Sequence, residues 1–219
     1  MKRFDAVLFD LDGVLADSEP MWNDIDAAML AHYGVTYRGE HKASVLGKSF
    51  PIALRFYKDT FGVQAPIEEM FTRRSEIALD FYARQIPMYP GAPRVLQWLR
   101  DENLKLSLAT SSVGSIVQPF LDRNDIAKYF HALTFGEEVE NGKPHPDIYL
   151  KAAAKVGVEP ARCLVVEDAL SGIQAGKSAG MTVVAIPDAR FVDVALYPGQ
   201  ADVIFDELGE LTAWMTHNN

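Results

Sequence analysis

Four short apolar segments stand out along the chain, and polar residues follow each of them directly. They cover residues 4–9, 104–108, 164–166 and 182–186. Short apolar runs of this kind are typical of buried strands. Segments with helical spacing of apolar residues lie between them, at 90–99, 148–156 and 169–179. Because alternating strands and helices form parallel sheets with right-handed crossovers, we predict an α/β fold with a Rossmann-like, doubly wound parallel sheet.

The stretch between the first two apolar segments breaks this alternation, because its apolar residues follow helical spacing throughout. The apolar positions of its three expected helices are Trp22, Ile25, Met29 and Tyr33, then Ile52 and Phe56, then Ile67, Met70, Phe71, Ile77 and Phe81. We therefore predict a small α-helical cap domain over residues 18–87, inserted into an α/β core domain of residues 1–17 and 88–219. Insertions at this edge of a sheet often act as lids.

Composition narrows the class of protein. The 219 residues are 48% hydrophobic and carry a net charge of -9, which argues against binding to nucleic acid. Cys163 is the only cysteine, so an intrachain disulfide is excluded, and we expect a buried, inert thiol. The apolar run that follows Lys2 and Arg3 is too short for a signal peptide. We expect a cytoplasmic monomer that does not bind membranes.

Asp10 and Asp12 lie two residues apart at the end of the first predicted strand. Side chains at this spacing point the same way in an extended chain, so two carboxylates face one small space. Such a pair requires a shared proton or a metal ion. Gly13 permits a tight turn beside it. Taken alone, the segment is more typical of a turn that ends a strand.

Glu167 and Asp168 place two more carboxylates at the end of another predicted strand. Magnesium prefers hard oxygen ligands and takes few of them from the protein, and Asp10 and Asp168 are the natural pair. An alternative role for Asp168 is to cap the helix predicted at 169–179. In that helix, Gly172, Gly176 and Gly180 are expected to allow close packing against the sheet.

Thr110 and Ser111 follow the second predicted strand and offer a hydroxyl and backbone N–H groups at the same sheet edge. These groups suit phosphate oxygens, although helix capping is an ordinary alternative. Lys143 stands in a loop that contains a glycine and two prolines, and it supplies a cation. A lone loop lysine is usually solvated, but these neighbours restrict its backbone.

In this order, the four segments resemble the haloacid dehalogenase superfamily over essentially the whole chain. Residues 9–19 resemble its first motif, and Thr110, Lys143-Pro144 and Glu167-Asp168 resemble the second, third and fourth. The helical insertion resembles the small cap of the subgroup that contains sugar-phosphate phosphatases, phosphoglycolate phosphatases and beta-phosphoglucomutase.

The resemblance implies a magnesium-dependent phosphatase that acts on small phosphomonoesters, such as sugar, polyol or glycolate phosphates. Asp10 would attack phosphorus and form an aspartyl-phosphate, while Asp12 would protonate the leaving alcohol and then deprotonate the attacking water. Magnesium would be held by Asp10, the main-chain carbonyl of Asp12 and Asp168, with Glu167 nearby. Lys143, Thr110 and Ser111 would bind phosphoryl oxygens.

Four other functions compete with phosphate ester hydrolysis. Beta-phosphoglucomutase has a histidine where this chain has Trp22, which favours the phosphatase, although Trp22 also fits a packing role inside the cap. Dehalogenases of this fold lack the second aspartate, and phosphonatases also depart there. A non-catalytic sugar-phosphate sensor would be expected to have lost a motif residue, and here none is lost. In the cap, Lys48 and Glu19 are candidates to reach the substrate.

Overall fold

The computed structural model describes residues 4–37 and 50–219. The chain forms two compact units. Unit 1 comprises Met1–Asp17, Pro87–Gly114 and Leu121–Asn219, and unit 2 comprises Ser18–Ile86 and Ser115–Phe120. Residues 115–120, which the sequence assigns to the core domain, thus group with the inserted segment. The domain limits expected from the sequence, residues 18–87 for the cap and residues 1–17 with 88–219 for the core, stay a prediction.

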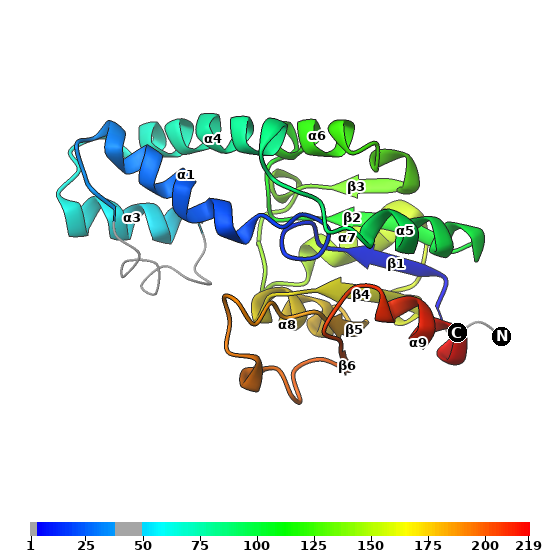
Figure 1. Cartoon of the computed structure of the whole chain (residues 1–219). Coiled ribbons are helices and arrows are strands. Elements are labelled where there is room, and N and C mark those ends of the chain that lie inside the picture. Colours follow the sequence, from blue (N-terminus) through cyan, green and yellow to red (C-terminus); the bar gives the residue numbers. More distant parts are fainter. Residues whose placement is uncertain (1–3, 38–49) are drawn as a thin grey trace. The chain divides into compact units, whose positions relative to one another are not determined.

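Unit 1 contains a six-stranded parallel sheet with the strand order β3-β2-β1-β4-β5-β6 (Figure 1). The strands are β1 (Ala6–Phe9), β2 (Lys105–Ala109), β3 (Ala132–Thr134), β4 (Cys163–Glu167), β5 (Thr182–Ala185) and β6 (Val203–Ile204). The predicted α/β fold is confirmed. The edge strands β3 and β6 were missed, because runs of three and two residues are too short to show a pattern.

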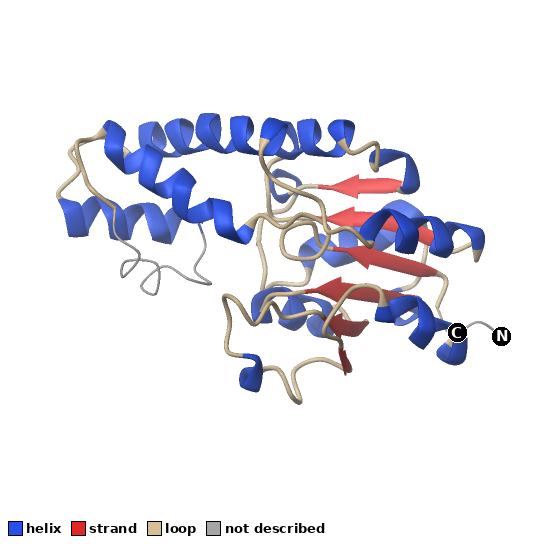
Figure 2. Ribbon diagram, viewed as in Figure 1, coloured by secondary structure: helices blue, strands red, loops and turns tan. Residues whose placement is uncertain are grey.

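Helices cover both faces of this sheet (Figure 2). On one face lie α5 (Ala92–Asp101) and α9 (Glu210–Asn218), and on the other lie α7 (Asp147–Val156) and α8 (Leu170–Ser178) (Figure 1). Four 3-10 helices are formed by Ala127–Tyr129 (η2), Gly136–Glu138 (η3), Pro160–Arg162 (η4) and Val194–Leu196 (η5) among the described residues. All four residues of β1 are buried, as expected for a central strand with both faces covered.

The register of β1 aligns the ends of the central strands. Phe9 lies opposite Leu108 of β2 and Val166 of β4. Asp10 therefore leaves the sheet level with Ala109 and Glu167, the next residues along those two strands. The carboxyl ends of parallel strands are where ligands bind in such sheets, so the register gathers the predicted site residues at one edge.

The three glycines of the α8 region have different roles. A Cβ at Gly172 would lie 1.8 Å from Glu167 Oε1, and one at Gly176 would lie 2.8 Å from Val183 Cγ2, so both positions require close packing. Gly180 differs, because a Cβ there meets nothing within 4 Å and its φ is +77°. The packing role expected for Gly180 is therefore wrong: this glycine follows the end of α8 in the left-handed conformation.

Unit 2 consists of α1 (Glu19–His32), α3 (Phe50–Phe61) and α4 (Ile67–Arg84), with residues 115–120 of α6 (Gly114–Arg123). Its core includes Met29, Leu54, Tyr57 and Met70. The three predicted helices are present, but Phe71, expected on the apolar face of the last, is 39% exposed. Tyr82, farther along α4, is buried instead.

Polar groups are paired inside unit 2. Asp26 is buried and accepts from Tyr57 Oη at 2.6 Å and from Arg74 Nε at 2.5 Å. The Arg74 guanidinium lies 4.6 Å from the centre of a Trp22 ring, and Trp22 also meets Tyr82 edge to face. Burying a carboxylate raises the free energy of the fold unless the carboxylate is paired. The bonds of Asp26 to Tyr57 and Arg74 therefore hold α1 against α3 and α4.

Cys163 is fully buried at the start of β4, as expected, and burial raises the pKa of its thiol to about 11. Within residues 4–37 and 50–219, no helix has the length and apolar character needed to cross a membrane.

Candidate active site

Asp10 begins the loop that follows β1 and is only 6% exposed. Its backbone N–H donates to the carbonyl of Val166 at 3.0 Å, which extends the pairing of β1 with β4 by one residue. Its Oδ1 accepts from Lys143 Nζ at 2.7 Å. Burial raises the pKa of Asp10 to about 7, and the nearby Lys143 opposes this effect.

Lys143 is the cation of the site. Its Nζ also donates to Glu167 Oε1 at 2.5 Å and lies 3.3 Å from the carbonyl oxygen of Ala109. Only 8% of its side chain is exposed, so this loop lysine is not solvated. Burial by itself lowers the pKa of Lys143, but Asp10 and Glu167 outweigh burial and raise it above its ordinary value. The ammonium group therefore stays charged at neutral pH.

Both carboxylate oxygens of Glu167 accept hydrogen bonds. Its Oε1 accepts from Lys143 and, at 2.6 Å, from Tyr149 Oη, while Oε2 accepts the backbone N–H groups of Asp168 at 3.1 Å and Ala169 at 3.2 Å. The N-cap of α8 is Ala169, so the alternative role of Asp168 as the helix cap is wrong. The carboxylate of Glu167 accepts the N–H groups of the two residues that precede this helix.

Tyr149 was missed as a site residue by the sequence analysis. Its spacing with Ala152 and Val156 correctly indicates the buried face of α7, and a buried tyrosine needs a partner for its hydroxyl. The Lys143 ammonium also lies 5.0 Å from the centre of the Tyr149 ring. Burial and the neighbouring Glu167 raise the pKa of Tyr149 well above its ordinary value, so the hydroxyl stays a donor.

Carboxylate oxygens of Asp10, Glu167 and Asp168 lie within 4.8 Å of one another. The site holds three acidic groups and one buried ammonium, which pairs with Asp10 and Glu167, so the cluster has an excess of negative charge that suits a divalent cation. Hard oxygen donors of this kind are those that magnesium prefers. The side chain of Asp12 lies outside this group of three.

Asp12 instead contacts the loop that follows β2. Ser112 Oγ donates to Asp12 Oδ2 at 2.9 Å, and the N–H of Ser112 donates to Thr110 Oγ1 at 3.0 Å. Thr110 is fully buried, whereas Ser111 is exposed. Thr110 and Ser111 were predicted as site residues and Ser112 was not, although the sequence has three consecutive hydroxyl residues there.

Two residues of the inserted segment, Lys48 and Glu19, were predicted to reach the substrate. Lys48 lies outside the described residues, so its predicted approach to substrate stays a prediction. Glu19 is in the first turn of α1 and is partly buried.

Known proteins are similar to this chain in sequence and in fold. Residues 7–186 match the family model described as haloacid dehalogenase-like hydrolase. The chain belongs to this family. The chain is 32% identical over 177 residues to a phosphorylated carbohydrates phosphatase of Thermotoga maritima, covering 81% of this chain and 82% of that one. It is 31% identical over 216 residues to hexitol phosphatase B of Escherichia coli, covering 95% and 94%.

A solved structure from Thermotoga maritima, assigned to a beta-phosphoglucomutase, has a TM-score of 0.80 and 28% identity, and the match covers 98% of this chain and 99% of that one. The haloacid dehalogenase fold of this chain is thus confirmed by structure as well as by sequence. The prediction of a phosphatase of the haloacid dehalogenase type, a phosphoric monoester hydrolase, is confirmed by the family match and the names of these relatives.

Proposed function

We propose that this haloacid dehalogenase family member is a magnesium-dependent phosphatase of small sugar or polyol phosphates that works through an aspartyl-phosphate at Asp10. The relatives named for phosphorylated carbohydrates and hexitols support this class of substrate. A phosphorylated metabolite of this size is the expected partner. The cytoplasmic location and the monomeric state expected from the sequence stay predictions.

One observation carries the proposal: a buried lysine joins the carboxylates of Asp10 and Glu167, with Asp168 beside them. A buried carboxylate at a strand end supplies a nucleophile, the fixed ammonium supplies a cation for an anionic substrate, and the further acidic groups could hold a metal ion as a second cation. Phosphoryl transfer depends on such groups, because its transition state spreads negative charge over the equatorial oxygens.

Magnesium fits the three carboxylates, and we assign Asp10 and Asp168 to hold it together with the main-chain carbonyl of Asp12. Glu167 supports them from nearby, because its oxygens already accept four hydrogen bonds. When bound, the ion would neutralise phosphate charge.

The reaction on this chain has two halves. In the first, a carboxylate oxygen of Asp10 forms a bond to phosphorus while the bond to the substrate alkoxide breaks, and Asp12 gives its proton to that alkoxide. In the second, Asp12 takes a proton from water, the water oxygen bonds to phosphorus, and the bond to Asp10 breaks. Lys143, Thr110 and the Ser111 backbone would bind the phosphoryl oxygens throughout.

The contacts of Trp22 favour water over a sugar hydroxyl as the final acceptor of the phosphoryl group. The mutase resemblance requires a histidine at this position, which can carry a proton. Trp22 instead packs between Arg74 and Tyr82 inside unit 2, and its indole N–H does not titrate. Hydrolysis needs no proton carrier there, so this packing role is compatible with a phosphatase.

The proposal is tested by phosphate release from a panel of sugar, polyol and glycolate phosphates, with magnesium and with a chelator. We expect activity on sugar or polyol phosphates that is lost with chelator and restored by magnesium, and no turnover by Asp10→Asn. Activity that is indifferent to chelator contradicts the metal assignment. Strict dependence on a sugar bisphosphate, without release of phosphate, contradicts hydrolysis and favours the mutase.

A further inference from the structure

Ser112 faces the carboxyl group of Asp12, which transfers protons in the proposed mechanism. Its hydroxyl lies 2.9 Å from Asp12 Oδ2 and is partly buried. A hydroxyl donates to an ionised carboxylate and, after rotation, accepts from a protonated one. The contact with Ser112 can therefore persist whether the carboxyl group of Asp12 accepts or donates the hydrogen bond, whereas a lysine ammonium in its place could only donate.

The backbone of Ser112 is fixed on both sides of the residue. Its N–H donates to Thr110 Oγ1 at 3.0 Å, and its carbonyl accepts from the N–H of Gly136 at 3.1 Å. A Cβ at Gly136 would lie 2.1 Å from the carbonyl oxygen of Ser111, so the two segments touch through backbone alone. The hydroxyl of Ser112 therefore projects from a rigid support.

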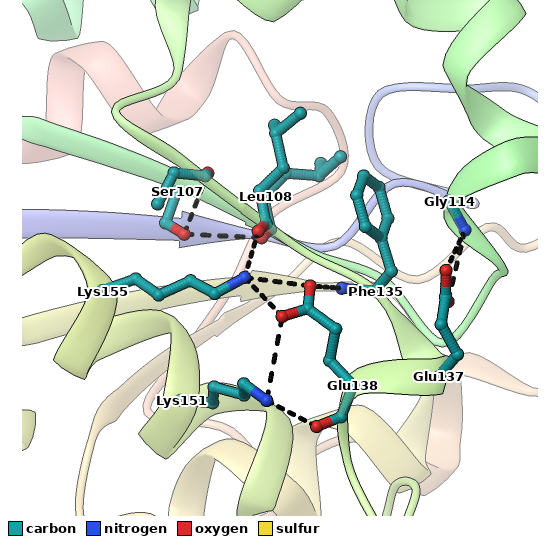
Figure 3. Close-up of polar contacts among 10 residues, drawn as sticks. Ser107, Leu108, Gly114, Phe135, Glu137, Glu138, Lys151 and Lys155 are labelled. Carbon is teal, nitrogen blue, oxygen red and sulfur yellow. Dashed lines mark hydrogen bonds and ion pairs between the residues drawn. The ribbon is translucent and has the colours of Figure 1, made fainter.

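The support continues through the turn at residues 135–138 (Figure 3). Glu137 accepts from the N–H of Gly114 at 2.9 Å, which ties the loop after β2 to this turn. Glu138 accepts from the N–H of Phe135 at 3.0 Å and from Lys155 Nζ of α7 at 2.7 Å. Helix α7, which also carries Tyr149 of the site, thus contacts the turn that supports Ser112.

We propose that Ser112 is a positioning residue for Asp12, holding its carboxyl group in the direction from which protons pass to the leaving alcohol and from the attacking water. This inference rests on the proposed function, because it gives Asp12 the acid and base roles. General acid catalysis requires the proton donor within hydrogen-bond reach of the leaving oxygen, so a carboxyl group that rotates freely is less effective. Ser112 restricts the rotation of the Asp12 carboxyl group through its hydrogen bond to Oδ2.

The test is the dependence of kcat/KM on the leaving group. This parameter reports the steps up to aspartyl-phosphate formation, and an aryl phosphate such as p-nitrophenyl phosphate leaves without a proton, whereas a sugar or polyol phosphate needs one. We expect Ser112→Ala to lower kcat/KM about 10- to 100-fold for the alkyl phosphate, part of the gain that general acid catalysis supplies. For the aryl phosphate we expect a loss of less than about threefold.

Two further variants make the result specific. Ser112→Thr keeps the hydroxyl and is expected to restore most of the alkyl phosphate activity. Ser115→Ala removes an exposed hydroxyl three residues along and is expected to leave both substrates unaffected. Equal losses on both substrates for Ser112→Ala, or failure of threonine to restore activity, would overturn the inference.

Asp12→Asn is measured in the same series to separate this inference from the proposed function. If Asp12→Asn shows the leaving-group dependence and Ser112→Ala does not, only the role of Ser112 is wrong. If Asp12→Asn spares the alkyl phosphate as well, the acid role of Asp12 in the proposed function is wrong, and the inference about Ser112 falls with it.

Discussion

Gly13 lies against Asp168 so closely that any side chain at position 13 would collide with the carboxylate. A Cβ built on Gly13 would lie 2.1 Å from Asp168 Oδ2 and 2.4 Å from its Cγ. The φ of Gly13 is +79°, a conformation that other residues rarely adopt. Glycine is therefore required at position 13 for two reasons. The turn needs a positive φ, and the carboxylate of Asp168 leaves no room for a side chain.

Gly13→Ala is expected to displace Asp168 and to lower phosphatase activity by at least about 10-fold, because a 1 Å misplacement of a site group costs about this much or more. The matched control is Gly180→Ala, at a φ of +77° with nothing within 4 Å of the added Cβ. Both variants lose about 1–2 kcal/mol of stability from the left-handed backbone. Equal activities of the two variants would contradict the role of the Gly13–Asp168 contact.

Lys143→Met tests the buried cation. The change leaves Asp10 and Glu167 buried without their shared ammonium, so we expect activity to disappear and the free energy of unfolding to fall by about 3–5 kcal/mol in the absence of metal. Added magnesium should recover part of this stability if the three carboxylates bind it. Urea unfolding with and without magnesium gives both values.

The control for this change is Lys177→Met. Lys177 pairs with Asp202 at 2.6 Å, but its side chain is 41% exposed, so its removal is expected to cost less than about 1 kcal/mol. If Lys143→Met were no more destabilising than Lys177→Met, the two buried carboxylates would not depend on Lys143 for their charge balance.

Tyr149→Phe removes the hydroxyl that donates to Glu167 Oε1 at 2.6 Å and leaves the ring in place. Hydrogen bonds to charged groups contribute about 1.5–3 kcal/mol, so we expect a loss of this size together with lower kcat/KM, since Glu167 also holds Lys143. Tyr197→Phe is the contrast, because its hydroxyl donates at 2.7 Å to the uncharged carbonyl of Asp168. A smaller stability loss, about 0.5–1.5 kcal/mol, is expected there. Equal losses in the two variants would show that the charge of Glu167 does not strengthen the bond.

The sequence predicted the sheet and its polar edge because both follow from local pattern. Buried strands appear as apolar runs, and parallel topology brings their ends together, so Asp10, Thr110 and Glu167 were expected at one edge. The contact between Lys143 and Asp10 spans 133 residues of chain and was not predicted, because the family resemblance implied only that both residues act on the same phosphoryl group. Periodicity along the chain does not encode such contacts.

Tyr149 and Ser112 were not predicted as site residues. In both cases the local sequence pattern indicates a different role from the one that the polar side-chain atom has in the structure. Tyr149 has the spacing of a core residue and is one, yet its hydroxyl serves the site. Ser112 was passed over in favour of Ser111, because one residue of difference in a turn changes which side chain faces inward. Turn geometry depends on the tertiary contact with Gly136, which no local pattern shows.

The ion pair between Glu138 and Lys155 holds the turn at residues 135–138, and its contribution to stability depends on pH. Burial tends to raise the pKa of Glu138, but the hydrogen bonds from Lys155 and the Phe135 N–H outweigh it and lower the pKa below the ordinary value of 4.5. The folded protein therefore binds this proton more weakly than the unfolded chain does. The ion pair stabilises the fold above pH 4.5, and its contribution is lost as the pH falls through the lowered pKa.

Glu138→Gln should remove this contribution, about 1 kcal/mol or less because Glu138 and Lys155 are partly exposed. The difference in unfolding free energy between wild type and Glu138→Gln is expected to be largest near neutral pH and to vanish toward acid, in urea titrations at several pH values. Glu76→Gln, whose Arg73 partner lies with it on the surface, should show a smaller difference. A Glu138 difference that stays constant into acid would mean that its carboxylate does not anchor the 135–138 turn through charge.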